Sequence, residues 1–350
     1  MYSEADLQSA VAAGALSHDA AEALRAHSAG MRSAPVADEE HFRLITGFND
    51  IFVTIAAALL LFAAASIGDA TAPGVAGALV AAAAWGMAEF FTRQRRMALP
   101  SIVLLLAFVG GIAAIPINIL AETAPDLSDR TGALIGAGIG LMAAGAAWLH
   151  WRRFMVPITV AAGTAGIAAT LIALVVAAVM PMVGQGNAEQ VLLPLVFVAG
   201  LGVFAVAMRW DMSDRARETR RSDVAFWLHL LAAPMIAHPL FHWLGVTDGG
   251  VVSPAAAIGV LAIYVLMGLV ALAIDRRALL VSALAYVLAA MTWLFREFGM
   301  VELNVAITGL VIGSALLCLS AFWSPIRRAV VGQLPGNVRE RLPATGLALA

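Results

Sequence analysis

The first long apolar run of the chain, residues 51–67, reads IFVTIAAALLLFAAASI and contains no charged side chain. An α-helix needs about 20 apolar residues to cross the ~30 Å hydrocarbon core of a bilayer. Comparable runs recur as far as residue 323, so this stretch marks the first span of a multi-pass membrane protein. Hydrophobic residues make up 61% of the chain and charged residues 13%, whereas about a quarter of a soluble domain is charged.

Ten segments of the chain have the length and hydropathy of a transmembrane helix. The sequence therefore predicts an all-α fold, a polytopic transmembrane helix bundle of about ten spans. The predicted spans are residues 51–67, 72–91, 99–120, 131–151, 154–183, 191–208, 223–245, 251–274, 278–295 and 301–323.

The arginines indicate how these spans are oriented. All 21 basic residues are arginine, and all but Arg130 and Arg296 fall on one side of the ten-span arrangement. Cytoplasmic connections are enriched in basic residues, so both termini are expected in the cytoplasm of a bacterial inner membrane. Arginine pairs also recur, which indicates either a repeated helical hairpin or simply the positive-inside topology. The pairs are residues 95–96, 152–153, 220–221, 276–277 and 327–328.

Three regions are predicted from this pattern. Residues 1–45 form a cytoplasmic helical hairpin and linker, in which Ser3 and Ser17 cap the two helices and Gly14 ends the first. Residues 46–325 form the transmembrane bundle of repeated hairpins. Residues 326–350 form a cytoplasmic C-terminal tail.

Several classes of function are disfavoured by composition and by missing motifs. The net charge of -2 offers no concentrated basic face for nucleic acid. One cysteine, Cys318, excludes an intramolecular disulfide framework. The sequence contains no Walker loop, GxSxG elbow or HExxH motif, so we predict no cofactor and consider an enzyme less favoured than a transport or binding protein.

Ionisable groups inside the apolar segments are the best functional candidates, because each costs about 2.5 to 3.5 kcal/mol at a helix centre. The segment 223–245 carries His229, His238 and His242, with two prolines that are expected to kink it. His238 and His242 are four residues apart and share a helix face. These imidazoles could move a proton, contact a polar ligand or bind a metal, or they could simply form hydrogen bonds with their neighbours.

Other polar residues are predicted at the same outer level of the membrane. Glu302 and Asn304 open the last predicted span, Arg296 precedes them, and Asn118 closes the third span. Converging helix ends would give an outward-facing polar vestibule around His238 and His242, in which Glu302 could complete a metal site. The alternative is ordinary placement at the membrane interface.

Glycines are spaced for close helix contact. Gly132, Gly136 and Gly140 form a double GxxxG frame in the fourth span, and Gly163 and Gly166 follow in the fifth. Small residues let two helix backbones approach in lipid. We expect these glycines to pack helices within the chain.

The layout of the chain resembles that of uncharacterised bacterial integral-membrane proteins of the domain-of-unknown-function type. The resemblance is carried by the opening ADLQSAVAAGALSHDAAEALRAH and the repeated basic elbows. It implies an N-terminal helical pair, many spans and a bacterial inner-membrane location, with no assigned activity. A chain of ten spans with both ends inside also resembles the layout of the drug/metabolite transporter superfamily.

The sequence thus predicts an integral membrane protein that transports or binds a small solute or a lipid, with the bilayer itself as a partner. One alternative is a membrane-embedded metal-dependent enzyme using His238 and His242. Another is an anchor or interaction protein that acts through its N-terminal hairpin.

Overall fold

The structure, a computed structural model of the chain, is helical, and none of the residues it describes lies in a β-strand. The all-α fold class is therefore confirmed. The chain forms two compact units, Met1–Phe42 and Arg43–Ala350. The described residues are 4–31, 48–183, 188–215, 217, 219–246, 253–277, 279–280, 283–284, 287–288, 304–340 and 342–343.

The first unit is a pair of short helices, α1 (Glu4–Ala12) and α2 (His18–Met31). Gly14 ends the first helical segment with a positive φ of 70°, a conformation that costs glycine little. Ser17 Oγ then accepts a hydrogen bond from the Ala20 amide at 3.2 Å, as expected of an N-cap. The two helices expected from the sequence are present, whereas Ser3, the predicted cap of the first, lies outside the described residues.

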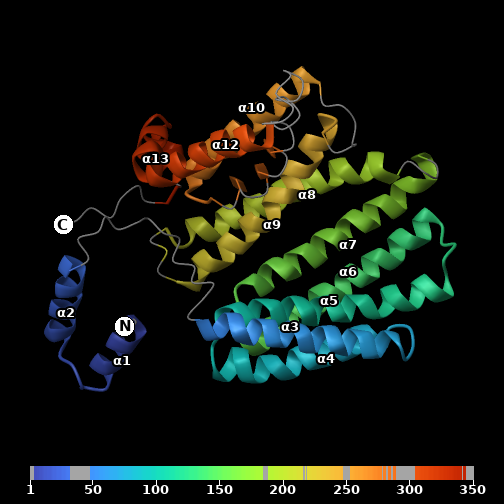
Figure 1. The fold of residues 1–350 in the computed structure, drawn as a ribbon, viewed down its shortest axis with the longest axis horizontal. Helices are drawn as coiled ribbons and strands as arrows, with labels where there is room; N and C mark the ends of the chain where they lie inside the picture. The colour runs from blue at the N-terminus through green and yellow to red at the C-terminus, as the bar shows by residue number, and fades with distance from the viewer. Residues whose placement is uncertain are drawn as a thin grey trace. The chain divides into compact units, whose positions relative to one another are not determined.

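Eight helices of the second unit are long and apolar enough to cross a membrane. They coincide with the first eight predicted spans, and the chain is an integral membrane protein. Figure 1 shows them running back and forth. They are α3 (Phe48–Asp69), α4 (Val75–Ala88) with its π-helical continuation η1 (Glu89–Gln94), α5 (Ala98–Thr123), α6 (Asp129–Phe154), α7 (Ile158–Val183), α8 (Ala188–Met212), α9 (Arg220–Trp243) and α10 (Pro254–Ile274).

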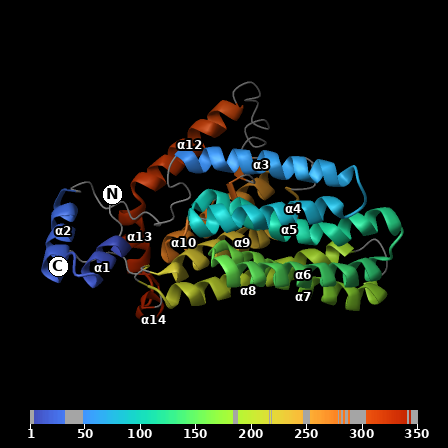
Figure 2. The ribbon, with the colours of Figure 1, turned by 90° about the horizontal axis from the view of Figure 1, so that it is seen from below.

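The C-terminal part of the bundle contains a sharp bend. Helix α12 (Asn304–Ala321) meets α13 (Trp323–Gly332), and the parts Gly309–Ala321 and Trp323–Gly332 are bent by 75°. Figure 2 shows the change of direction between α12 and α13. A short helix, α14 (Gly336–Arg339), follows. The tenth predicted span corresponds to α12, whereas most of the ninth, 278–295, lies outside the described residues. The described residues thus supply eight spans, or nine if the bent pair counts as one.

Large apolar side chains cover the outside of the helices. Phe52, Leu59 and Phe62 on α3, and Leu171 on α7, are exposed on the chain. A soluble protein rarely exposes a continuous apolar surface of this kind. These side chains are therefore suited to contact lipid.

Glycines allow two pairs of neighbouring helices to touch backbone to backbone. A Cβ added to Gly166 on α7 would lie 2.8 Å from Gly140 O on α6, and one added to Gly111 on α5 would lie 2.8 Å from Gly77 O on α4. Thr170 Oγ1 also donates a hydrogen bond to Ala137 O at 3.2 Å across the α6–α7 contact. Of the predicted glycines, Gly140 and Gly166 make this close contact within the chain, whereas nothing lies within 4 Å of a Cβ added to Gly132. A Cβ added to Gly136 or Gly163 would meet only one side chain, at 4.0 and 3.6 Å.

The turns that carry the arginines share one backbone geometry. All four non-glycine residues with a positive φ in the described part of the chain lie in these turns. The left-handed conformation costs an ordinary residue about 1 to 2 kcal/mol, so its use in every such turn indicates a common construction. The four residues are Arg96 (φ 53°), Met155 (φ 52°), Arg217 (φ 56°) and Asp275 (φ 59°).

Candidate functional site

The predicted outer residues fall on separate parts of the described structure. His238 and His242 share one face of α9 as predicted, with ring centroids 6.5 Å apart; His238 is exposed and His242 half-buried. Asn118 instead lines a groove of about 330 Å³ formed by α3, α4 and α5, together with Asp69. No residue of α9 lines this groove among those described. These three side chains therefore do not share one vestibule wall.

The remaining predicted outer residues cannot be placed in a site. Arg296 and Glu302 lie outside the described residues. Asn304 begins α12, but its side chain also falls outside the described part. Within the described residues, no three His, Cys, Asp or Glu side chains are grouped so that they could hold a metal ion. The proposed metal site with Glu302 stays a prediction.

His229 belongs to a different cluster, at the arginine-bearing end of the bundle. It lies on α9 and is 0% exposed, and its Nε2 lies 2.8 Å from Asp211 Oδ2 at the end of α8. Its Nδ1 is buried without a partner among the described residues. A histidine predicted as an intramembrane candidate is thus paired with an acid that the sequence pattern did not single out.

The same carboxylate pairs with Arg276 from the turn after α10. Arg276 Nε donates to Asp211 Oδ2 at 3.3 Å and its Nη2 donates to Asp211 Oδ1. Arg276 Nη2 also donates to Ser222 O and Oγ on α9, both at 3.1 Å. Asp211 and Arg276 are each 2% exposed. Water therefore does not solvate the two charges, and each is compensated by the opposite charge of the other. The cluster ties the ends of α8, α9 and α10 together.

A second cluster surrounds the neighbouring acid, Asp275. Its Oδ2 accepts from Arg217 Nη1 at 2.8 Å, and its Oδ1 accepts from Trp323 Nε1 at 2.7 Å. Arg327 Nε lies 3.6 Å from Oδ1, and Arg327 is 1% exposed. One carboxylate thus connects the α8–α9 turn with α13.

These arginines also satisfy the carbonyl groups at the end of α10. The last carbonyls of a helix have no partner within it, and they form the negative end of its dipole. Arg327 donates to Leu272 O at 3.1 Å, and Arg217 donates to Ile274 O at 3.2 Å and Asp275 O at 3.0 Å. This is why basic side chains can be buried at this position.

The C-terminal segment also contributes to this end of the bundle. Arg327 Nη2 donates to Pro343 O at 2.8 Å, and Arg215 Nε donates to Leu342 O at 3.1 Å. Leu342 is buried. The first part of the region predicted as a tail therefore packs against the bundle as far as residue 343.

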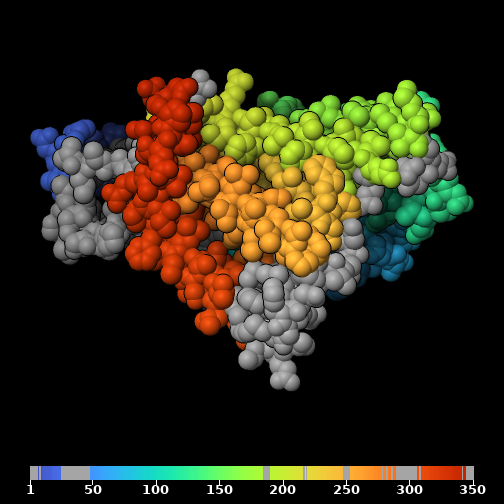
Figure 3. All heavy atoms as spheres, turned by 90° about the horizontal axis from the view of Figure 1, so that it is seen from above, coloured from blue at the N-terminus to red at the C-terminus, as the bar shows by residue number. Residues whose placement is uncertain are grey.

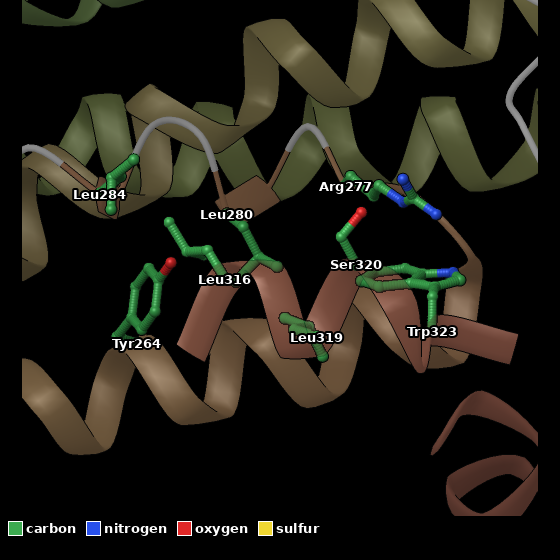
Figure 4. Close-up of a pocket in the computed structure, with 8 residues that line it drawn as sticks. All are labelled: Tyr264, Arg277, Leu280, Leu284, Leu316, Leu319, Ser320 and Trp323. Atoms are coloured by element: carbon green, nitrogen blue, oxygen red, sulfur yellow. The ribbon is translucent and has the colours of Figure 1, made fainter. Parts of the chain in front are cut away.

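A cavity of about 170 Å³ adjoins the Asp275 cluster. Figure 3 shows α12 and α13 against α10, and Figure 4 shows the lining side chains. Four of the eight lining residues are leucines, and the polar groups lie at the two ends. The lining residues are Tyr264, Arg277, Leu280, Leu284, Leu316, Leu319, Ser320 and Trp323.

Arg277 differs from the arginines beside it. Its guanidinium lies 4.8 Å from the centroid of the Trp323 ring, a cation–π contact. The described residues give it no carboxylate partner, whereas Arg217, Arg276 and Arg327 each face an acid. The cavity therefore has one positive group at its edge whose charge is not compensated by the described protein.

A third acid–arginine pair occurs on the earlier helices. Arg153 at the end of α6 donates to both oxygens of Glu89 in η1, from Nε at 2.7 Å and from Nη2 at 2.8 Å. Arg93 also pairs with Glu89 at 3.3 Å, the expected i, i+4 contact. This site is partly exposed, unlike the Asp211 pair.

His150, close to this pair, is enclosed by aromatic rings. Its ring centroid lies 4.5 Å from that of Phe154, 6.0 Å from Phe108 and 6.2 Å from Trp85. Thr159 Oγ1 is 3.4 Å from its Nδ1, and Nε2 is buried without a described partner. No cavity or second ionisable group accompanies it in these contacts, so we assign it to helix packing.

The sequence patterns did not point to Asp211, Asp275 or Tyr264, and they marked Arg276, Arg277 and Arg327 only as topology signals. The order acid–arginine–arginine at residues 275–277 directly after an apolar span was the available clue. Comparison with known proteins adds no constraint, since no family model matches the chain and searches of curated proteins and of solved structures also find no match.

Proposed function

We propose that this membrane protein binds a small anionic amphiphile at the arginine-bearing end of its bundle. The observation that carries the proposal is Arg277, which has no described carboxylate partner and stands at the edge of an apolar cavity. An apolar pocket with a few polar groups is the usual form of a small-molecule site. The chemistry shared by the candidate ligands is a carboxylate or phosphate attached to a hydrocarbon chain.

The cavity walls favour a hydrocarbon chain over a polar solute. Leu280, Leu284, Leu316 and Leu319 offer no hydrogen bonds, so a sugar or amino acid would lose its hydration without compensation. A hydrocarbon chain that enters the cavity removes only apolar surface from water, and this burial is favourable by about 25 cal/mol per Å². An anionic head group would remain near Arg277 and the Trp323 ring.

We propose further that the arginine-bearing ends face the cytoplasm of a bacterial inner membrane. The support is the segregation of the arginines, together with the positive-inside rule. The ligand head group would then lie at the cytoplasmic interface. Bilayer lipids and free fatty acids both present anionic head groups there.

Calorimetric titration of the full chain in phosphatidylcholine nanodiscs tests the binding proposal. Decanoate is the probe, decan-1-ol is the uncharged control, and heats from empty nanodiscs are subtracted. Decanoate is expected to bind wild-type protein about tenfold more tightly than Arg277→Gln, since one charge-assisted contact is lost. Arg328→Gln is the matched control, because Arg328 is exposed and does not line the cavity.

Two results would contradict the proposal: no decanoate binding to wild-type protein, or equal binding to wild type and Arg277→Gln. Native mass spectrometry of the chain released from its own membrane then separates the two ligand sources. A retained anionic phospholipid identifies a bilayer lipid as the ligand. A chain released without lipid that still binds decanoate identifies a free acid.

A further inference from the structure

Tyr264 presents an unusual polar group to the same cavity. Its Oη is buried and has no hydrogen-bond partner among the described residues, although it lies within α10, a membrane-spanning helix. Buried tyrosine hydroxyls usually find a partner, because an unsatisfied hydroxyl is costly in an apolar environment. Figure 4 shows Tyr264 at one end of the cavity, with Arg277 and Trp323 at the other.

We infer that the cavity recognises its ligand at two points and that the ligand is an oxygenated fatty acyl chain. The anionic end would face Arg277, and an ether, hydroxyl or carbonyl oxygen within the chain would accept a hydrogen bond from Tyr264 Oη. This inference rests on the proposed function and adds the second contact. It explains why one tyrosine hydroxyl remains unpaired among the leucines of the cavity.

The geometry of α10 favours a linear chain over a ring. Tyr264 lies ten residues before Ile274, the last residue of the helix, which corresponds to about 15 Å along the axis. Arg277 follows in the turn beyond this end. The side chains of Tyr264 and Arg277 reach from these levels to opposite ends of one cavity, so an extended acyl chain can contact both more readily than a compact ring.

The cavity volume limits how much of the chain it encloses. An apolar cavity of about 150 Å³ takes up one molecule of benzene, which has six carbons. The cavity of about 170 Å³ beside Tyr264 therefore encloses a similar length of chain, about six carbons. The head group would lie outside this enclosed part, near Arg277.

The two contacts predict a selectivity that decanoate alone cannot show. An ether oxygen in place of one methylene makes the chain more polar wherever it is placed, and this change should weaken binding to the leucine walls. Only an oxygen that meets Tyr264 Oη would regain a hydrogen bond, which corresponds to about fivefold in affinity. Affinity should therefore depend on where the oxygen is placed.

The experiment is a positional scan by calorimetry with the full chain in phosphatidylcholine nanodiscs. The probes are decanoate and a series of oxadecanoates, each with one ether oxygen in place of one methylene. For wild-type protein we expect one position to bind about fivefold more tightly than its neighbours in the series. Tyr264→Phe removes only the hydroxyl and should remove this maximum, when each oxadecanoate is compared with decanoate bound to the same variant.

The outcomes separate the two proposals. A flat series that is identical in wild type and Tyr264→Phe, with decanoate bound through Arg277, overturns the two-point inference and leaves the proposed function standing. A maximum that persists in Tyr264→Phe also overturns it, because another group must then donate. Failure of every probe to bind wild-type protein overturns both. The thermal unfolding midpoint of each variant confirms that a loss of binding reflects the folded protein.

Discussion

Arg276, in the turn after α10, is paired with Asp211 at the end of α8, an acid that precedes it by 65 residues. Arg153, at the end of α6, is paired in the same way with Glu89 in η1, 64 residues earlier. In both cases the arginine of one basic turn reaches the acid at the preceding one. The repeated basic turns therefore share a left-handed residue, and in these two cases successive turns are also joined by an acid–arginine pair.

Removing the carboxylate of the buried pair should destabilise the protein strongly. Asp211→Asn removes the carboxylate that is hydrogen-bonded to the buried Arg276 guanidinium, and breaking such a pair costs about 3 to 5 kcal/mol. Unfolding by SDS in mixed micelles, followed by circular dichroism, measures the change. Glu89→Gln is the matched control and should cost much less, because its pair is partly exposed. Equal losses in the two variants would contradict a special role for burial at Asp211.

The glycine contact between α6 and α7 should not tolerate a methyl group. A Cβ at Gly166 would lie 2.8 Å from both Gly140 O and Ala144 N, so Gly166→Ala should cost about 1 to 3 kcal/mol through overpacking. Gly138→Ala on α6 is the control, since nothing lies within 4 Å of its added Cβ. Thermal unfolding in detergent should show a lower midpoint for the first variant only. A normal midpoint for Gly166→Ala would show that the helices separate without cost.

The hydroxyl of Tyr264 should not contribute to the stability of the ligand-free protein. Tyr264→Phe removes a buried group without a described partner, so the free energy of unfolding should be unchanged or rise by up to about 1 kcal/mol.

A partnered hydroxyl provides the comparison for that variant. Thr170 Oγ1 donates to Ala137 O at 3.2 Å and to Gly166 O at 2.8 Å, so Thr170→Val should lose about 1 kcal/mol. Both variants are measured by the same SDS titration. A marked loss of stability in Tyr264→Phe would mean that the hydroxyl already has a protein partner, and it would count against a ligand contact there.

The orientation of the bundle can be tested by cysteine labelling. Cys318 is replaced by alanine first, and single cysteines are then placed at Ser213, in an arginine-bearing turn, or at Thr71, in a turn without arginine; both positions are exposed. In intact cells, a membrane-impermeant maleimide should label Thr71→Cys, and it should reach Ser213→Cys only after the membrane is opened. Labelling of Ser213→Cys in intact cells would reverse the proposed orientation.

Hydropathy predicted the membrane-spanning helices well because each span is a local property of about 20 residues. The predicted spans 51–67 and 251–274, for example, differ from α3 and α10 by only a few residues at each end. Gly14 and Ser17 likewise predicted the break between α1 and α2, since turn and cap preferences act over a few neighbouring residues.

The candidate site was harder to predict because its contacts are not local. His229 could be identified as a polar residue in an apolar span, but its partner Asp211 lies at a helix end, where an acid is indistinguishable from one facing water. Arg276 and Arg277 are adjacent and look equivalent in the sequence. One is buried against Asp211 and the other lines a cavity, and this difference depends on the path of α12 and α13.

The pairing of Asp211 with Arg276 has a consequence for how the protein is made. The two residues leave the ribosome 65 residues apart, which at roughly 5 to 20 residues per second corresponds to about 3 to 13 seconds. During this interval α9 brings His229 to Asp211, but the arginine that compensates the charge of the acid has not yet been synthesised. The hairpin can reach its final arrangement only after the next one has entered the membrane, so biogenesis of this end of the molecule must wait for translation.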